Sequence, residues 1–282
     1  TLSGGTRTLA ASTVNFVDTL AGGTNGLTIT GNLDLDGAAT GLTTLEVSGT
    51  SNLGANVTTS STQTYSGAVI ISNNITLTTT DSNITFGATT NAGTAGNTLT
   101  IAAGSGDVTF TDAVGGTTAM GNMTITTGAL SAAAMKVQGT IDITNTDTST
   151  ITGIISDGAS SAIVTKAGSA TLTLSGNNTY TGQTNINAGT LAVTVNNALG
   201  TNAAGTVIAS GATLDLQNVT YSTTEAITNN GGTLSTSTGT SSLAVVMTLG
   251  ANSTIDVDGT QLTISTAIGD GSGGYGITKT GA

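Results

Sequence analysis

Two pairs of aspartates come closest, among the residues of this chain, to a catalytic or metal-binding arrangement. Each pair belongs to an Asp-x-Asp-Gly sequence, formed by Asp34, Asp36 and Gly37 and by Asp256, Asp258 and Gly259. Two carboxyl groups about 5 to 10 Å apart perform glycoside hydrolysis. Two hard oxygen donors beside a turn also suit calcium. The chain has no histidine and no cysteine, so carboxylates are its main remaining route to acid–base or nucleophilic catalysis.

Other features of the composition weigh against catalysis. Carbohydrate sites commonly add aromatic rings and arginine, yet aromatic residues make up 2% of the chain and Arg7 is its only arginine. Neither pair has the spacing of an EF-hand or of a calcium-binding nonapeptide repeat. We therefore predict solvated carboxylates, no catalytic, cofactor-binding or metal-ligating residue, and no enzyme. The sequence leaves calcium binding at the two Asp-x-Asp-Gly turns open.

A short alternation of apolar and small polar residues dominates the chain and predicts the elements that would carry these aspartates. It is seen in Leu27 to Thr30, Leu33 to Asp36, Ile75 to Thr78, Leu172 to Leu174 and Leu262 to Ile264. A period of two places aliphatic side chains on one face of a strand and threonine or aspartate on the other. Asp34 and Asp36 then share one outer face, as do Asp256 and Asp258. Glycine and asparagine clusters between the runs predict tight turns.

Many short strands with one apolar face are compatible with a sandwich, a barrel or a β-solenoid. We predict an all-β, right-handed parallel β-helix, because the side chains are small, aromatic residues are few and the sequence repeats internally. The absence of proline agrees, since each backbone N–H is needed for pairing. Coils of about 20 to 25 residues would give about a dozen turns and a rod about 60 Å long. Asparagines at the turns are expected to stack on asparagines of the next coil.

The sequence predicts one continuous rod with a softer internal boundary. Residues 1–160 carry loose repeats, and residues 161–282 carry a clearer unit that begins at Val164 and restarts at Ile277. The segment from Leu130 to Val137 is alanine-rich, and we interpret Met135 to Val137 as a strand rather than as part of a helix. The incomplete second copy indicates an excerpt of a longer polypeptide.

The charge balance excludes some partners. Fifteen acidic residues face four basic ones, for a formal net charge of −11. Binding to nucleic acid or to anionic membranes needs clustered lysine and arginine, so we predict no nucleic-acid partner. The sequence contains no apolar run long enough to insert into a membrane.

Two further patterns are attributed to composition. Asn-x-Thr sequences, such as Asn74 to Thr76, are expected from the abundance of asparagine and threonine alone. Thr-x-Thr strands, such as Thr76 to Thr78, are too irregularly placed to predict one flat ice-binding lattice.

The segment from Val164 to Leu191 resembles a known repeat family. It contains a starting segment Lys166 to Gly168, a strand Leu172 to Gly176, a turn Asn178 to Gly182 and a closing segment Ile186 to Leu191. These pieces are similar to the autotransporter-associated β-strand repeat, also called the passenger-associated transport repeat. The resemblance implies a right-handed parallel β-helix outside a Gram-negative cell, carried by a longer polypeptide, and it does not imply catalysis.

These features lead us to expect a structural or adhesive segment of a large bacterial surface or secreted protein. The expected location is extracellular or on the outer cell surface of a Gram-negative bacterium. Candidate partners are other copies of the chain and components of cell surfaces or the extracellular matrix. One alternative is a fibre subunit in which the restarted repeat at Ile277 is completed by Thr1 to Gly4 of a neighbour. A less favoured alternative is a β-helix that binds or cleaves glycans.

Overall fold

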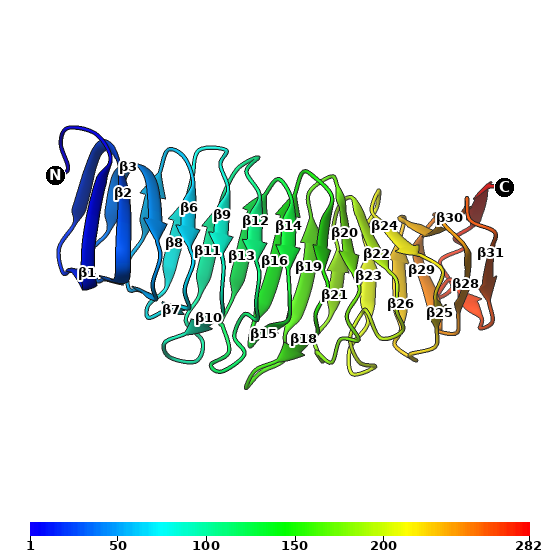
Figure 1. Cartoon of the computed structure of the whole chain (residues 1–282). Helices are drawn as coiled ribbons and strands as arrows, with labels where there is room; N and C mark the ends of the chain where they lie inside the picture. Colours follow the sequence, from blue (N-terminus) through cyan, green and yellow to red (C-terminus); the bar gives the residue numbers. More distant parts are fainter.

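The computed structural model describes residues 1–282 and shows one β-solenoid of about 13 turns with parallel strands and no helix. Figure 1 shows the coils following one another from the N-terminus to the C-terminus, which lie at opposite ends of the rod. The structure thus confirms the predicted all-β solenoid. No helix that could cross a membrane is present.

Each full coil has up to three strands, and equivalent strands of successive coils stack into three faces. The long strands β1 (Arg7–Phe16), β2 (Leu20–Leu35) and β3 (Ala39–Val47) bend and contribute to more than one face. Face 1 continues with β6 (Gln63–Tyr65), β9 (Ile84–Phe86), β12 (Val108–Phe110), β14 (Leu130–Ala132), β17 (Ser149–Ile151), β20 (Thr171–Leu174), β22 (Thr190–Val193), β24 (Thr213–Leu216), β27 (Thr233–Thr236), β30 (Ser253–Val257) and β33 (Ile277–Gly281).

Face 3 is built in the same way and runs the length of the rod. Beyond β2 and β3 it consists of β5 (Val57–Thr59), β8 (Ile75–Thr78), β11 (Leu99–Ala102), β13 (Met123–Thr127), β16 (Thr140–Asn145), β19 (Ile163–Ala167), β21 (Thr184–Ile186), β23 (Thr206–Ile208), β26 (Ile227–Asn230), β29 (Met247–Ala251) and β32 (Ile268–Gly269).

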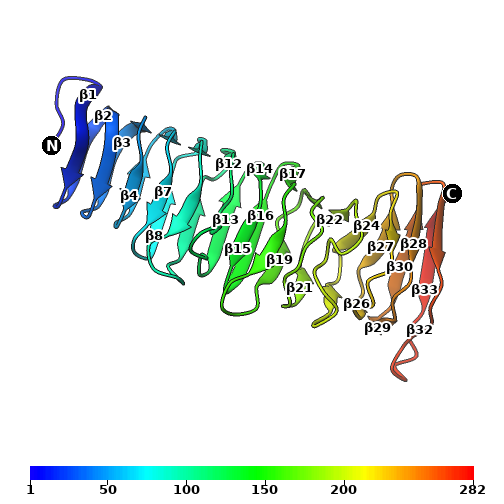
Figure 2. The ribbon, with the colours of Figure 1, turned by 60° about the horizontal axis from the view of Figure 1, so that its bottom comes forward.

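Face 2 is interrupted. Its first part consists of β1, β2, β4 (Ser51–Leu53), β7 (Val69–Ile71) and β10 (Thr90–Ala92). The two-stranded sheet of β15 (Met135–Val137) and β18 (Ile155–Asp157) follows, and only single bridges at Val114 connect it to β10. The last part of face 2 is the separate sheet of β25 (Thr220–Tyr221), β28 (Thr240–Leu243) and β31 (Gln261–Ile264). The coils between β18 and β25 have no strand on this face. Their loops, green to yellow in Figure 2, lie between the middle of the rod and its C-terminal end.

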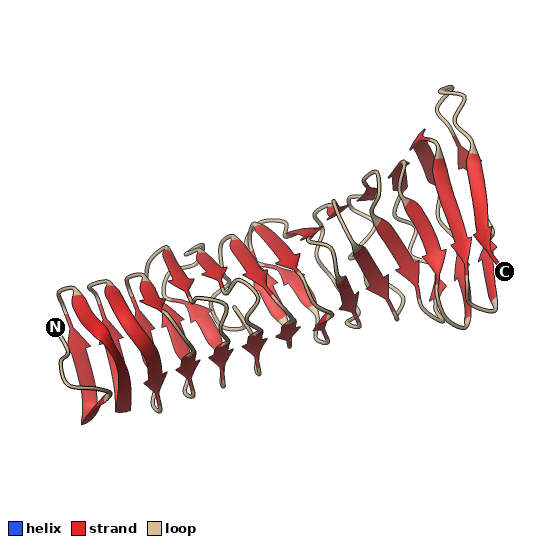
Figure 3. Ribbon diagram, turned by 90° about the horizontal axis from the view of Figure 1, so that it is seen from above, coloured by secondary structure: helices blue, strands red, loops and turns tan.

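Strand register explains why the coils tolerate unequal length. Leu27 pairs with Leu45 after 18 residues, whereas Ile84 pairs with Val108 after 24 residues. The paired strands keep inward positions aligned, and the turns and loops between them absorb the difference. Figure 3, which views the rod from above, shows the short strands joined by such loops.

A single hydrophobic core of 58 buried residues fills the solenoid. The inward positions of successive strands form columns, of which the bulkiest is aromatic. The rings of Tyr65 and Phe86 stack with centroids 5.5 Å apart, and those of Phe86 and Phe110 stack at 4.5 Å and 8°. The strand register places these rings one above another. Three of the seven aromatic side chains therefore lie in one column, which the sequence analysis did not predict.

Asparagines at the corners join neighbouring coils, but not in the predicted manner. Six of them, here named the corner asparagines, directly precede a strand segment, and each accepts a hydrogen bond at Oδ1 from a backbone N–H of the next coil. They are Asn32, Asn56, Asn74, Asn83, Asn122 and Asn252, with distances of 2.8 to 2.9 Å. The prediction that asparagines stack on asparagines is wrong for these positions, because the register places a different residue above each of them. The backbone N–H of that residue is the available donor.

Two smaller predictions from the sequence have different outcomes. The alanine-rich segment forms β14 and β15, so the interpretation of Met135 to Val137 as a strand is confirmed. The boundary near residue 160, between residues 1–160 and 161–282, stays a prediction. Backbone pairing runs across it, from β16 to β19 and from β17 to β20.

Phe86→Ala tests the aromatic column. Phe86 has a ring on both sides and no exposed surface, so truncation leaves a cavity and lowers the free energy of unfolding by about 3 to 5 kcal/mol. Denaturant unfolding followed by circular dichroism measures the loss. The control Ile70→Ala changes a side chain that is 47% exposed and should cost only about 0.5 kcal/mol. Equal losses in both variants would contradict the importance of stacking.

Asn122→Ala tests the corner asparagines. The change removes the acceptor for the backbone N–H of Thr140 and should lower the free energy of unfolding by about 1 kcal/mol. Asn122→Asp keeps an oxygen at the same position and should retain most of that stability. Equal effects of alanine and aspartate would show that this hydrogen bond does not stabilise the coil.

Candidate functional site

The structure places Asp34 and Asp36 on the outside of the solenoid near its N-terminal end. Asp34 lies on β2, half-buried, and its Oδ1 accepts a hydrogen bond of 2.8 Å from Nδ2 of Asn52 in the next coil. Asp36 follows the strand and is exposed. The N–H of Gly37 donates to the carbonyl oxygen of Phe16 at 3.1 Å, which ties this turn to the preceding coil. The first pair thus combines an inter-coil hydrogen bond with a solvated turn.

Asp256 and Asp258 are arranged in a similar way near the other end. Asp256 accepts a hydrogen bond of 2.7 Å from Oγ1 of Thr280 in the next coil, and Asp258 is exposed in the turn after β30. No group of three or more acidic side chains is close enough to hold a metal ion. The four aspartates lie on outer positions, as the alternation predicts, and the two pairs lie in coils far apart along the rod (Figure 1).

Polar side chains are instead brought together inside the solenoid, around the segment that begins at Val164. Lys166 occupies an inward position of β19, where the register places it between Ile143 and Ile186. Its side chain is fully buried. Nζ donates to the carbonyl oxygens of Ala167 and Gly168 at 2.6 and 2.9 Å, and to that of Ala188 in the next coil at 3.1 Å.

Burial lowers the pKa of Lys166 to about 8, because the charged ammonium group loses hydration in the core. Three carbonyl oxygens replace part of that hydration. Lys166 therefore acts as an internal connection between two coils.

The following turn contributes two more buried connections. Asn178 accepts a hydrogen bond of 2.7 Å at Oδ1 from the N–H of Ile155, and Nδ2 donates to the carbonyl oxygen of Ala198. One side chain thus joins three successive coils. The hydroxyl of Tyr180 lies 2.6 Å from Oγ1 of Thr184, so the tyrosine fills the core while its polar end is satisfied.

Glu225 lies in the same buried region, in the loop before β26, and is 1% exposed. Oγ1 of Thr206 donates to one carboxylate oxygen, and the hydroxyl of Tyr221 lies 3.4 Å from the other. Burial raises the pKa of Glu225 to about 7, and these two hydrogen bonds only partly oppose the shift. Burial also raises the pKa values of Tyr180 and Tyr221, so both phenols stay neutral near pH 7.

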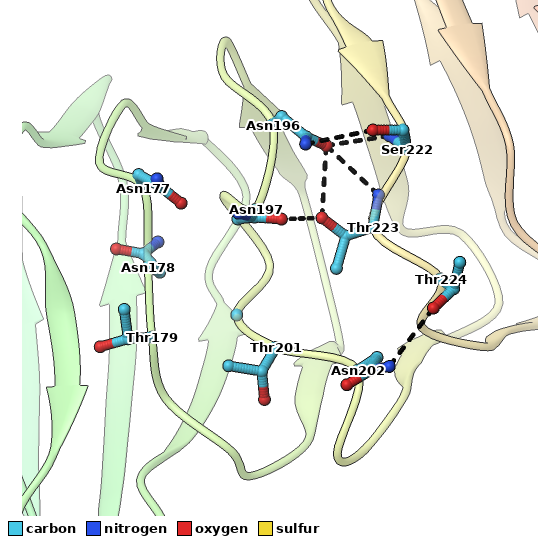
Figure 4. Close-up of a pocket in the computed structure, with 11 residues that line it drawn as sticks. Asn177, Asn178, Thr179, Asn196, Asn197, Thr201, Asn202, Ser222, Thr223 and Thr224 are labelled. Atoms are coloured by element: carbon cyan, nitrogen blue, oxygen red, sulfur yellow. Dashed lines mark hydrogen bonds between the residues drawn. The ribbon is translucent and has the colours of Figure 1, made fainter.

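A polar groove of about 470 Å³ lies above this buried region, where face 2 has no strand. Neither charged nor hydrophobic side chains line it. Its lining residues are Asn177, Asn178, Thr179, Asn196, Asn197, Gly200, Thr201, Asn202, Ser222, Thr223 and Thr224. Figure 4 shows them on neighbouring loops, with Asn196 bonded to Ser222, Asn197 to Thr223 and Asn202 to Thr224.

Gly200 allows the floor of the groove to approach the core. Its φ is +94°, and a Cβ there would lie 2.8 Å from the ring of Tyr180. Only glycine permits both the backbone conformation and this close contact. The groove and the buried tyrosine are therefore parts of one local structure.

Outward hydroxyl groups are aligned along part of face 1. On face 1 the register forms one column of hydroxyl groups from Thr64, Thr85, Thr109, Ser131, Thr150 and Thr173. Glu46 precedes this column and Ala192 follows it. The column is one residue wide, so it is not a flat lattice, and the expectation about the Thr-x-Thr strands stays a prediction. Loops of unequal length return the chain to the same register and so keep the column aligned.

The parallel coils and the buried inter-coil connections define the chain as a β-helix repeat protein. Residues 164–193, which contain Lys166, Asn178 and Tyr180, match the family model of the passenger-associated-transport-repeat. Together with the solenoid, this match supports an autotransporter passenger-type β-helix repeat protein. No curated protein and no solved structure matches the chain.

Sequence reasoning recognised the repeat but not the role of its polar residues. From the sequence, Lys166 is only one of four basic residues and a part of the repeat motif. Its burial could have been predicted from its position two residues after Val164, because alternate residues of a strand point to the same side and Val164 points inward. Glu225 carried no such signal, because it lies outside any strand and becomes buried only when neighbouring coils stack.

Glu225→Gln tests the buried carboxyl group. Because its pKa rises from 4.5 in the unfolded chain to about 7 in the folded one, its contribution to stability is complete below pH 4.5 and is lost as the pH rises through 7. The loss should amount to about 3 kcal/mol in the surrounding coils. Thermal unfolding from pH 4 to 8 should show this decline in the wild type and not in Glu225→Gln.

The control for this experiment is Glu46→Gln. Glu46 is the only other glutamate and is exposed on β3, so its replacement should leave the decline unchanged. A decline of equal size in Glu225→Gln would assign the pH dependence to other groups.

Proposed function

We propose that this chain is a rigid structural segment of a bacterial surface protein, with adhesion or projection as its task. The observation that carries the proposal is the continuous stack of about 13 coils around one core, with a passenger-associated transport repeat inside it. Stacked coils contact only their neighbours, so extra coils lengthen such a rod without altering its cross-section.

The buried connections support a mechanical role. Lys166 and Asn178 each bond to groups in neighbouring coils, and they do so in the core, where water does not compete. Polar pairs that are shielded from water hold a unique geometry more strongly than exposed ones. They reinforce the region where face 2 lacks strands and where fewer backbone pairs join the coils.

We further propose that the chain is not an enzyme. Each candidate aspartate pair has one member engaged in an inter-coil hydrogen bond and the other in a solvated turn. Neither pair lines a groove, since none of the three cavities of the chain includes these aspartates. The proposed partners are other copies of the chain or components of cell surfaces and matrices, held by many weak contacts along the rod.

The repeat family suggests an extracellular or surface location in Gram-negative bacteria, and we propose the outer cell surface for this chain. The acidic, nearly cation-free surface fits this location, because it does not favour adsorption to anionic lipopolysaccharide or membrane lipids. Only three basic residues, Arg7, Lys136 and Lys279, lie outside the core, because Lys166 is fully buried.

Two measurements test the proposal. Electron microscopy of the purified chain should show separate rods about 60 Å long, as expected for 13 coils spaced by about 4.8 Å. Antibody against the chain should label intact source cells, and external protease should remove the signal. Labelling only after the outer membrane is permeabilised would contradict a surface location.

Other outcomes would favour the alternatives. Filaments many rod lengths long, formed by the purified chain alone, would favour the fibre subunit. Retention on immobilised glycans, lost when the groove residue Asn177 is replaced by arginine, would favour a glycan-binding β-helix. Release of reducing sugar from such glycans would contradict the proposal that the chain is not an enzyme.

A further inference from the structure

The corner asparagines coincide with a modification motif that the proposed structural role does not use. The chain contains seven Asn-x-Ser/Thr sequences, which begin at Asn56, Asn74, Asn83, Asn122, Asn177, Asn218 and Asn252. Composition accounts for their abundance but not for their placement. Five of the seven begin at corner asparagines, the exceptions being Asn177 and Asn218.

The two ends of the amide group have different environments at these five positions. Oδ1 accepts the N–H of the next coil at 2.8 to 2.9 Å, whereas Nδ2 donates no hydrogen bond within the chain. All five side chains are exposed. The amide nitrogen Nδ2 is therefore free to react, and the hydrogen bond at Oδ1 fixes the orientation of the amide group.

The strand that follows also presents the third residue of each sequence. The middle residue points into the core and is buried, as are Val57, Ile75, Ile84, Met123 and Ser253. The alternation then turns the threonine outward, to the same side as the asparagine. An enzyme that reads asparagine and threonine together can thus reach both on the folded rod, without any strand being opened.

We propose that these five asparagines are sites of N-glycosylation by a transferase that uses a nucleotide-activated sugar. Nδ2 attacks the anomeric carbon, and a C–N bond forms as the bond from that carbon to the diphosphate oxygen breaks. The nucleoside diphosphate leaves with the bonding electrons, and Nδ2 gives up one proton to a base of the transferase. Oδ1 is unchanged, so the hydrogen bond between coils survives the modification.

The structure supplies two internal comparisons. Asn32 is a corner asparagine with the same hydrogen bond, but Asp34 stands where the motif requires threonine. Asp107 occupies an equivalent corner, where its carboxylate accepts the N–H of Ala129 at 2.9 Å. The corner therefore needs only an acceptor oxygen, and an asparagine followed by threonine adds the nucleophilic nitrogen together with its recognition residue.

The experiment is peptide mass spectrometry of the chain purified from its source cells. A protease that cleaves beside aspartate is required, because trypsin has only four sites in this sequence. Hexose-sized mass increments are expected on peptides that contain the five asparagines, and none on Asn32. Unmodified peptides at all five positions, or equal modification of Asn32, would overturn the proposal.

Variants expressed in the same cells separate recognition from folding. Thr76→Val keeps the β-branched shape and the Asn74 hydrogen bond but removes the hydroxyl, so the increment on Asn74 should disappear. Thr76→Ser should restore it. Thermal unfolding of both variants should match the wild type. Modification of Asn74 that persists in Thr76→Val would show that the motif is not read, and would also overturn the proposal.

Discussion

Backbone hydrogen bonds from each coil to the next are the interaction on which the rest of this structure depends. Parallel pairing fixes the spacing of neighbouring coils at about 4.8 Å, and each strand residue of an inner coil then has an equivalent neighbour above and below it. Strands need to be only three or four residues long, because each is paired on both sides. Loops of different lengths are tolerated, provided that they return the chain to the same register.

The fixed spacing decides what the core accepts. Aliphatic residues and stacked rings form columns in one buried core, since equivalent residues of successive coils lie close enough to pack. Two buried ionisable side chains of the repeat region are satisfied by hydrogen bonds, whereas the buried hydroxyl groups of Ser51 and Thr90 have no partner. Lys166 has three carbonyl partners, and Glu225 has two hydroxyl partners. The cost of burying such groups is offset only in the stacked state, which makes the repeat region dependent on its neighbours.

The same spacing repeats chemistry on the surface. The hydroxyl column of face 1 and the corner asparagines arise because one outward position recurs in coil after coil. The binding free energies of weak contacts with a partner at each position can then add along the rod. The polar groove is the exception, since it exists where face 2 loses its strands and the loops separate. The regular surface is thus found where strands stack from coil to coil, and the groove is found where the strands of face 2 are missing.

Most of the strands, their inward and outward faces, the solenoid and the repeat beginning at Val164 are predictable from local alternation, composition and motif, which need no knowledge of distant residues. Other features become visible only in the folded rod: Lys166 and Glu225 are buried, the rings of the aromatic column stack, and the corner asparagines bond to backbone. Each of these depends on the register between coils, and turns of unequal length conceal that register in the sequence.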